Sequence, residues 1–308
     1  MQAAIETTLS LGMLIAIPIL IAALGEAISE RAGVLNIGLE GVMEWGALVG
    51  FIAVTSFQSL VVGFTAALMI GVIFGLVVAI LTVSLHANQF YTGIVLWIFS
   101  LGVTGFIHRM GFWHASTLDT SPLDVVIPPF DRIPILGPVL FRTNAMTYVA
   151  LVLTLMVWVL FEKTRAGLWI KAAGHRPEAL DTVGVSVVRV RYLCVVMCSV
   201  LAAIAGAHIS LIATGLYYSA GFFEGIVAGR GWIAIILVNF GSWRPLRILF
   251  GAILIGASWA LQIRLQTLLP GYPVHVFLML PYVVALMFLF LGRVSFPEAL
   301  GRAYVRQR

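Results

Sequence analysis

Apolar residues in this chain form long continuous runs that are separated by shorter polar segments. A helix needs about 20 mainly apolar residues to cross a bilayer, and no run shows the alternating pattern of a transmembrane β-strand. The pattern therefore predicts an all-α, polytopic transmembrane bundle. We expect crossings at residues 9–29, 41–58, 60–85, 91–107, 145–161, 192–213, 247–268 and 275–292.

A further apolar run, residues 230–241, is too short to cross a bilayer alone. Four glycines, from Gly221 to Gly231, lie in and before its start. We therefore expect it to form a broken span together with residues 217–228. This gives about eight to ten helices, counting broken or half helices, within a single integral-membrane domain over residues 1–308.

The composition fits a protein whose surroundings are mostly lipid. Apolar residues make up 61% of the 308 residues and charged residues only 10%. A soluble domain is about half apolar and about a quarter charged, and a disordered chain is still less apolar. The composition therefore excludes disorder and argues against a soluble enzyme.

The distribution of Lys and Arg predicts how the chain lies in the membrane. Basic residues concentrate on the cytoplasmic side of membrane proteins. With nine crossings, Arg31, segment 162–191, the turn at 242–247 and the C-terminal tail share one side and hold thirteen of the 18 basic residues. We expect that side to be cytoplasmic, with the N-terminus outside. The net charge of +5 then reflects topology rather than nucleic-acid binding.

Two long polar segments interrupt the apolar runs. Residues 108–143 contain five prolines and are expected to form an irregular extracytoplasmic loop. Residues 162–191 are expected in the cytoplasm. There, Pro177 suits the first turn of a short helix and Gly184 suits its end. Such a helix would offer a handle for a soluble partner, and the alternative is a plain solvated loop.

The motifs of several catalytic classes are missing from the sequence. It contains no Gly-rich phosphate loop ending in Lys-Ser or Lys-Thr, no His-Glu-x-x-His and no Gly-x-Ser-x-Gly. Cys194 and Cys198 lie in one apolar run and suit ordinary packing, whereas His108 and His114 are weak evidence for a metal. We therefore expect no catalytic residues, metal or cofactor in this chain, which would move a solute rather than transform one.

Polar residues at membrane depth are candidates for the transport pathway, because ionisable groups there are costly. Asn36, Glu40 and Glu44 are spaced by four and share one helix face, and Glu224 and Arg230 lie in the glycine-rich segment before residues 230–241. Interrupted helices in both halves of a chain are typical of transporter pathways. The alternative is structural: these charges cap helix ends, or Glu40 or Glu224 pairs with Arg230.

Three further polar residues interrupt apolar stretches and complete the candidate pathway. They are Asn88, Gln89 and Asn239. Hydrogen bonds that only stabilise helix packing explain them equally well.

Several stretches resemble ABC-transporter permeases of the nucleoside and simple-sugar uptake type. The resemblance extends from Ile17 to about Gly292, and its first motif, Glu30 to Met43, is the most specific. Further similar stretches are 173–185, 190–192, 229–235 and 240–245. Two features depart from the family pattern: Glu44-Trp45, where apolar residues are expected, and loop 108–143. Either could reflect the substrate.

The resemblance implies a division of labour among several chains. A second permease, identical or different, would complete the pathway, and a cytoplasmic ATPase carrying ATP and Mg would drive it. A periplasmic or lipid-anchored binding protein would deliver a nucleoside, a sugar or a flavin to the permease in the bacterial inner membrane. The residues implied in coupling to the ATPase are Gly174, His175, Arg176, Pro177, Glu178, Asp181 and Gly184.

Two other functions remain as alternatives. An ion-coupled secondary transporter would use Glu40, Glu44 or Glu224 to carry a proton and would work without ATP. A membrane enzyme would need polar residues clustered at one membrane face, which the sequence does not show.

Overall fold

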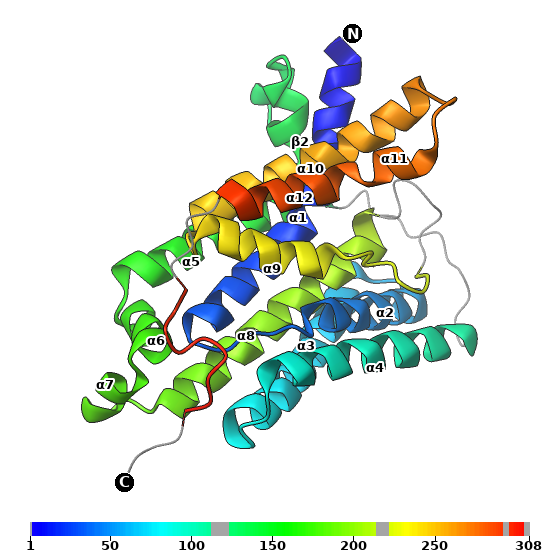
Figure 1. Cartoon of the computed structure of the whole chain (residues 1–308). Helices are drawn as coiled ribbons and strands as arrows, with labels where there is room; N and C mark the ends of the chain where they lie inside the picture. Colours follow the sequence, from blue (N-terminus) through cyan, green and yellow to red (C-terminus); the bar gives the residue numbers. More distant parts are fainter. Residues whose placement is uncertain (1, 112–122, 214–221, 292–295, 305–308) are drawn as a thin grey trace.

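The computed structural model describes residues 2–111, 123–213, 222–291 and 296–304. Within these ranges the chain is almost entirely helical, with one small hairpin (Figure 1). The elements are α1 (Gln2–Arg31), α2 (Leu39–Phe57), α3 (Leu60–Ala79), α4 (Gln89–Arg109), β1 (Asp124–Val126), β2 (Arg142–Asn144), α5 (Ala145–Lys163), α6 (Arg165–His175), α7 (Pro177–Thr182), α8 (Val187–His208), α9 (Arg230–Gly241), α10 (Pro245–Leu268), α11 (Val274–Leu278) and α12 (Leu280–Leu291).

Seven helices in the described part of the chain are long and apolar enough to cross a membrane. They are α1, α2, α3, α4, α5, α8 and α10, with α3 and α8 extended by π-helical turns at Ile80–Ser84 and Ile209–Ala213. The predicted polytopic all-α fold is confirmed. The predicted crossing at 275–292 is instead divided into α11 and α12, because Pro281 at the start of α12 has no N–H to continue the preceding helix.

The short apolar run 230–241 forms the half-helix α9, as expected. Its predicted partner half, residues 217–228, is not helical in its described part, which consists of two residues without regular structure followed by turns. Gly225 and Gly229 adopt φ of 75° and 79°, a left-handed conformation that interrupts a right-handed helix. Residues 217–221 lie outside the described residues.

Helix α1 runs through the middle of the bundle (Figure 1). In its most apolar window, 94% of the residues are buried inside the protein. It packs against α8, α9 and α10, whereas α2 and α3 pack against each other and against α8, and α4 packs against α2. Helix α8, which packs against α1 as well as against α2 and α3, connects the two groups.

Glycines allow α2, α3 and α8 to approach closely. A Cβ at Gly46 would collide with the backbone of Ala203, and one at Gly206 with the carbonyl of Met43. Gly71 likewise packs against Val200. Gly46 and Gly71 therefore serve contacts within one chain.

Opposite ends of the bundle carry the two polar segments (Figure 1). In the described part of loop 108–143, β1 and β2 pair antiparallel, and the backbone N–H of Ile135 donates to Glu6 near the start of α1, 3.2 Å away. At the other end lie α6, α7 and the C-terminal tail. Pro177 is the first residue of α7 and Gly184 follows it with φ of 81°, so the predicted short helix is confirmed.

Candidate functional site

Two buried glutamates of α2 hold the broken segment that precedes α9. Glu40 accepts hydrogen bonds from the backbone N–H groups of Gly229 and Gly231, each at 2.6 Å. One turn later, Glu44 accepts from the N–H groups of Gly225 at 2.8 Å and Val227 at 3.3 Å. We call these four contacts the carboxylate clamp. They arise because spacing by four on a helix directs both side chains to one face.

The clamp satisfies backbone donors that the broken segment leaves free. The first N–H groups of a helix have no partner within the helix, and a carboxylate near a helix N-terminus is favourable. Glu40 supplies this at the start of α9, and its side chain is 5% exposed. A Cβ at Gly231 would come within 2.7 Å of the Glu40 Cα, so glycine permits this close approach.

Arg230 and Glu224 do not pair with each other. The guanidinium of Arg230 stacks over the Trp259 ring at 4.7 Å and donates to the carbonyls of Ile226 and Val227, each at 3.0 Å. Glu224 instead pairs with Arg109 at 2.6 Å, and both side chains are at least half exposed. The structural alternative of an Arg230 bridge with Glu224 is therefore not seen, whereas helix capping by Glu40 is.

The remaining pathway candidates fall into two groups. The backbone N–H of Asn36 donates to Glu26 at 2.8 Å, and Gln89 accepts from the N–H of Leu35 at 2.8 Å, so Asn36 and Gln89 fix the turn between α1 and α2. Asn88 caps its own helix, α4. The Asn239 amide donates to a carbonyl within α9, at 3.2 Å.

The predicted coupling residues lie on one surface formed by α6, α7 and the turn after them. Gly174 packs directly on the backbone of Arg31 at the end of α1 and accepts from the N–H of Ala299 at 2.9 Å. Arg176 and Glu178 are exposed, and Asp181 is half-buried. His175 contacts the carbonyl of Lys171 in its own helix at 3.2 Å.

Arg191 ties this surface to the core, a role that the sequence analysis missed. It is 2% exposed and donates to three backbone carbonyls: Ala32 at 3.1 Å, Ala173 at 3.2 Å and Arg302 at 2.9 Å. These carbonyls belong to the turn after α1, to α6 and to the C-terminal tail. We call these contacts the arginine junction. Five donors in a planar fork make Arg suited to such a position.

The sequence analysis also missed two carboxylates on α1. Glu26 accepts from the Asn36 N–H and from the thiol of Cys198 at 3.1 Å, and Glu30 accepts from the Trp243 indole at 2.7 Å. Both glutamates are fully buried. Their spacing by four inside an apolar run was the available signal. Glu26 joins the end of α1 to the turn that precedes α2, and Glu30 joins it to the turn before α10.

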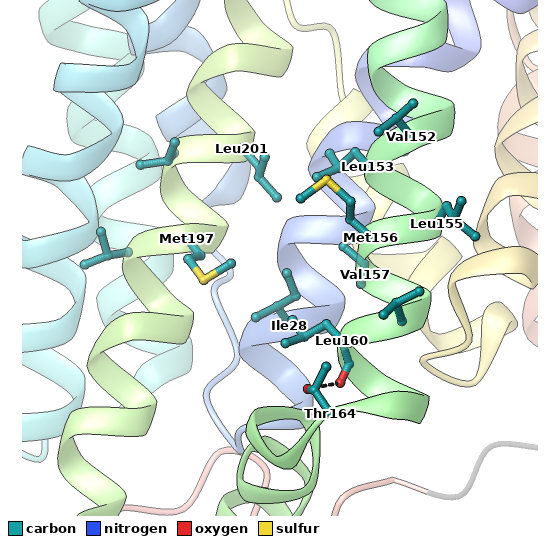
Figure 2. A pocket seen from close by; sticks show the side chains of 13 residues that line it. Ile28, Val152, Leu153, Leu155, Met156, Val157, Leu160, Thr164, Met197 and Leu201 are labelled. Atoms are coloured by element: carbon teal, nitrogen blue, oxygen red, sulfur yellow. Dashed lines mark hydrogen bonds between the residues drawn. The ribbon is translucent and has the colours of Figure 1, made fainter.

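A large apolar groove lies away from these polar contacts. Figure 2 shows it between α5 and α8, with Ile28 of α1 at its base; its volume is about 680 Å³. Thr164 is the polar residue among side chains that are otherwise aliphatic or Met, and Thr164 bonds to the Leu160 carbonyl. Such a lining cannot hydrogen-bond a polar solute, but it suits lipid chains or another apolar helix.

Comparisons with known proteins identify the family of the chain. Residues 8–291 match the family described as branched-chain amino acid transport system / permease component. No solved structure matches the chain.

Among the relatives are three whose names state a function. A putative glucose ABC transporter permease protein of Haloferax volcanii is 40% identical over 81% of this chain and 75% of its own length. The guanosine permease NupQ of Bacillus subtilis is 32% identical over 94% of both chains. The nucleoside permease NupC of Lactococcus lactis is 27% identical, again over 94% of both. The family match over most of the chain, with the relatives that share it, does not favour an ion-coupled secondary transporter, and the chain belongs to this family of ABC-transporter permeases.

Proposed function

We propose that this permease imports a nucleoside or a chemically similar solute, such as a sugar or a flavin. The observation that carries the proposal is the similarity to guanosine and nucleoside permeases over 94% of each chain. Because the chain is also similar to a putative glucose permease, sugars should be tested as substrates as well. The polar groups that such solutes require lie along α2, α4 and α9 rather than in the apolar groove.

The chain would work with three kinds of partner. A second homologous permease would complete the pathway, a cytoplasmic ATPase would hold ATP and Mg, and a binding protein would deliver the solute from outside. The exposed residues of α6 and α7 support this, since a surface that projects from the bundle is accessible to a soluble ATPase (Figure 1). We place this surface and the C-terminus in the cytoplasm and the N-terminus outside, following the distribution of Lys and Arg.

Force from the ATPase would reach the pathway through contacts that are continuous in the structure. Pressure on α7 would move α6, which packs on the end of α1 through Gly174 and is tied to it by Arg191. The turn after α1 leads through Asn36 to α2, which holds the broken segment through Glu40 and Glu44. Residues Asn36, Glu40, Glu44, Asn88, Gln89, Glu224 and Asn239 would line or support the path.

Competition for uptake tests the proposed substrate class. The measurement is uptake of labelled guanosine by cells with and without this chain and its partner chains. Excess unlabelled nucleosides, glucose, ribose and riboflavin are the competitors. We expect nucleosides to compete at much lower concentrations than the others. Competition by glucose alone would reassign the substrate to sugars, and uptake that is unchanged without the chain would contradict the proposal.

A further inference from the structure

A pocket of about 360 Å³ beside the coupling surface is lined by five basic side chains. Arg31 comes from the end of α1, Lys171 and His175 from α6, and Arg244 and Arg247 from the start of α10. Ser242 adds a hydroxyl, and no carboxylate is among the described residues that line the pocket. Concentrated positive charge in a concave site attracts anions.

The turn between α9 and α10 is well anchored, so the backbone that carries Arg244 is fixed beside the pocket. Ser242 and Trp243 both adopt left-handed backbone conformations, with φ of 50° and 56°. The Trp243 indole is anchored to Glu30, and its backbone N–H donates to the Val238 carbonyl at 3.2 Å. Arg244 then precedes a helix of 24 residues, whose N-terminus adds a partial positive charge at the pocket.

One terminal nitrogen of Arg31 lacks an acceptor among the described residues. The Arg31 side chain is 14% exposed, its guanidinium lies 4.2 Å from the centre of the Phe161 ring, and its Nη2 lies 3.8 Å from a Glu162 oxygen. Its other terminal nitrogen, Nη1, is buried and has no hydrogen-bond partner among the described residues. A buried donor without an acceptor is unfavourable, and a small movement of the Arg31 side chain would let this nitrogen reach an anion bound in the pocket.

We propose that this pocket binds the phosphate group of an anionic ligand. Arg and Lys are the side chains that recognise phosphate, and Arg does so with paired N–H groups. Two sources carry this chemistry: the headgroup of an anionic phospholipid, or a free phosphate or phosphate monoester. The cytoplasmic position of the pocket rests on the topology given under the proposed function.

Each source has support in the geometry. Leu246 and Phe250, 54% and 59% exposed, lie on the first turns of α10 and offer an apolar surface on which acyl chains can lie beside the pocket. Basic pockets at the cytoplasmic membrane surface bind lipid headgroups. The volume also accommodates a phosphate with further atoms attached. A ligand from either source would bridge α1, α6 and the turn before α10, so we expect it to hold the coupling surface against the core.

Binding to the purified full chain, with any chains that accompany it in mild detergent, tests the proposal. The probes are dioctanoyl phosphatidylglycerol and inorganic phosphate, with dioctanoyl phosphatidylcholine as the zwitterionic control. We expect one or both anionic probes to bind and to raise the midpoint of thermal unfolding. The double variant Arg244→Gln/Arg247→Gln should weaken binding at least tenfold. The control Arg142→Gln/Arg264→Gln removes the same charge from exposed positions elsewhere and should bind like the unaltered protein.

The outcomes separate the sources and allow the proposal to fail. Binding of phosphatidylglycerol alone assigns a lipid, and binding of inorganic phosphate alone assigns a free phosphate ligand. Equal loss in both double variants, or no binding of either probe, overturns the proposal. If neither probe binds and Arg244→Gln/Arg247→Gln instead releases an accompanying ATPase, the pocket receives an acidic protein segment. None of these measurements uses uptake, so they test the pocket whether or not the proposed substrate is correct.

Discussion

The carboxylate clamp and the arginine junction solve the same problem with opposite charges. In the clamp, Glu40 and Glu44 accept from N–H groups of a broken segment. In the junction, Arg191 donates to carbonyls where segments end. Neither uses an opposite charge as its hydrogen-bond partner. In both, a buried charged side chain is the hydrogen-bond partner of backbone groups at helix ends and in irregular segments.

The difference between them lies in what they connect. The clamp joins α2 to the segment before α9, at membrane depth. The junction joins α1, α6 and the C-terminal tail, next to the coupling surface. One therefore fixes the candidate pathway and the other fixes the element that would receive force. The comparison suggests that buried charges in this chain mark the places where separate segments must move together.

Arg191→Met should have the largest effect. It leaves three carbonyls without their donor and should destabilise the protein by about 3 kcal/mol, taking roughly 1 kcal/mol per hydrogen bond. We expect a clear fall in the midpoint of thermal unfolding and loss of substrate-stimulated ATP hydrolysis. The matched control is Arg189→Met, an exposed arginine two residues earlier. Equal stability of the two variants would show that the junction does not hold the segments together.

Glu40→Gln should have the next largest effect. An amide has one oxygen, so it cannot accept from both Gly229 and Gly231 as the carboxylate does. A loss of about 1–3 kcal/mol at this contact corresponds to at least a several-fold fall in uptake. Asp124→Asn, at an exposed carboxylate on β1 outside the candidate pathway, is the control. Unchanged uptake of every substrate by Glu40→Gln would make the clamp merely structural.

Glu178→Ala should separate folding from coupling. Glu178 is exposed in the first turn of α7, and its side chain makes no hydrogen bond or ion pair with the described residues. Its loss should therefore leave thermal stability unchanged. We expect ATP hydrolysis by the assembled transporter to lose its stimulation by substrate. Asp124→Asn, on the hairpin at the other end, should retain it. Normal coupled uptake in Glu178→Ala would contradict the assignment of α7 to coupling.

The Arg109–Glu224 pair should have the smallest effect. Both side chains are exposed, and exposed ion pairs contribute about 0–1 kcal/mol. Arg109→Gln should therefore change uptake less than twofold, and raising the salt concentration should remove even that difference. A large loss of uptake would show that this exposed pair contributes to transport, as the buried carboxylate clamp is expected to do.

Apolar runs and short motifs were enough to predict the helices and the segment around Pro177. Continuous runs define crossings because only helices satisfy their own backbone groups in lipid. The break between α11 and α12 was missed, although Pro281 was visible, because hydropathy does not register a lost N–H group.

The contacts within the candidate sites could be predicted only in part. The spacing of Glu40 and Glu44 placed both on one face, but their partners are N–H groups 181 to 191 positions later in the sequence. Arg191 was counted only as a basic residue for topology, because its three carbonyl partners come from segments far apart in sequence. Backbone groups have no identity in a sequence, so contacts to them require the fold.

Energy coupling tests the central claim most directly. The complex purified with this chain would be placed in vesicles, and uptake of labelled guanosine measured with and without ATP on the side of α6 and α7. The account predicts uptake that requires ATP hydrolysis and persists when the proton gradient is collapsed. Uptake by this chain alone, driven by a proton gradient without ATP, would contradict it.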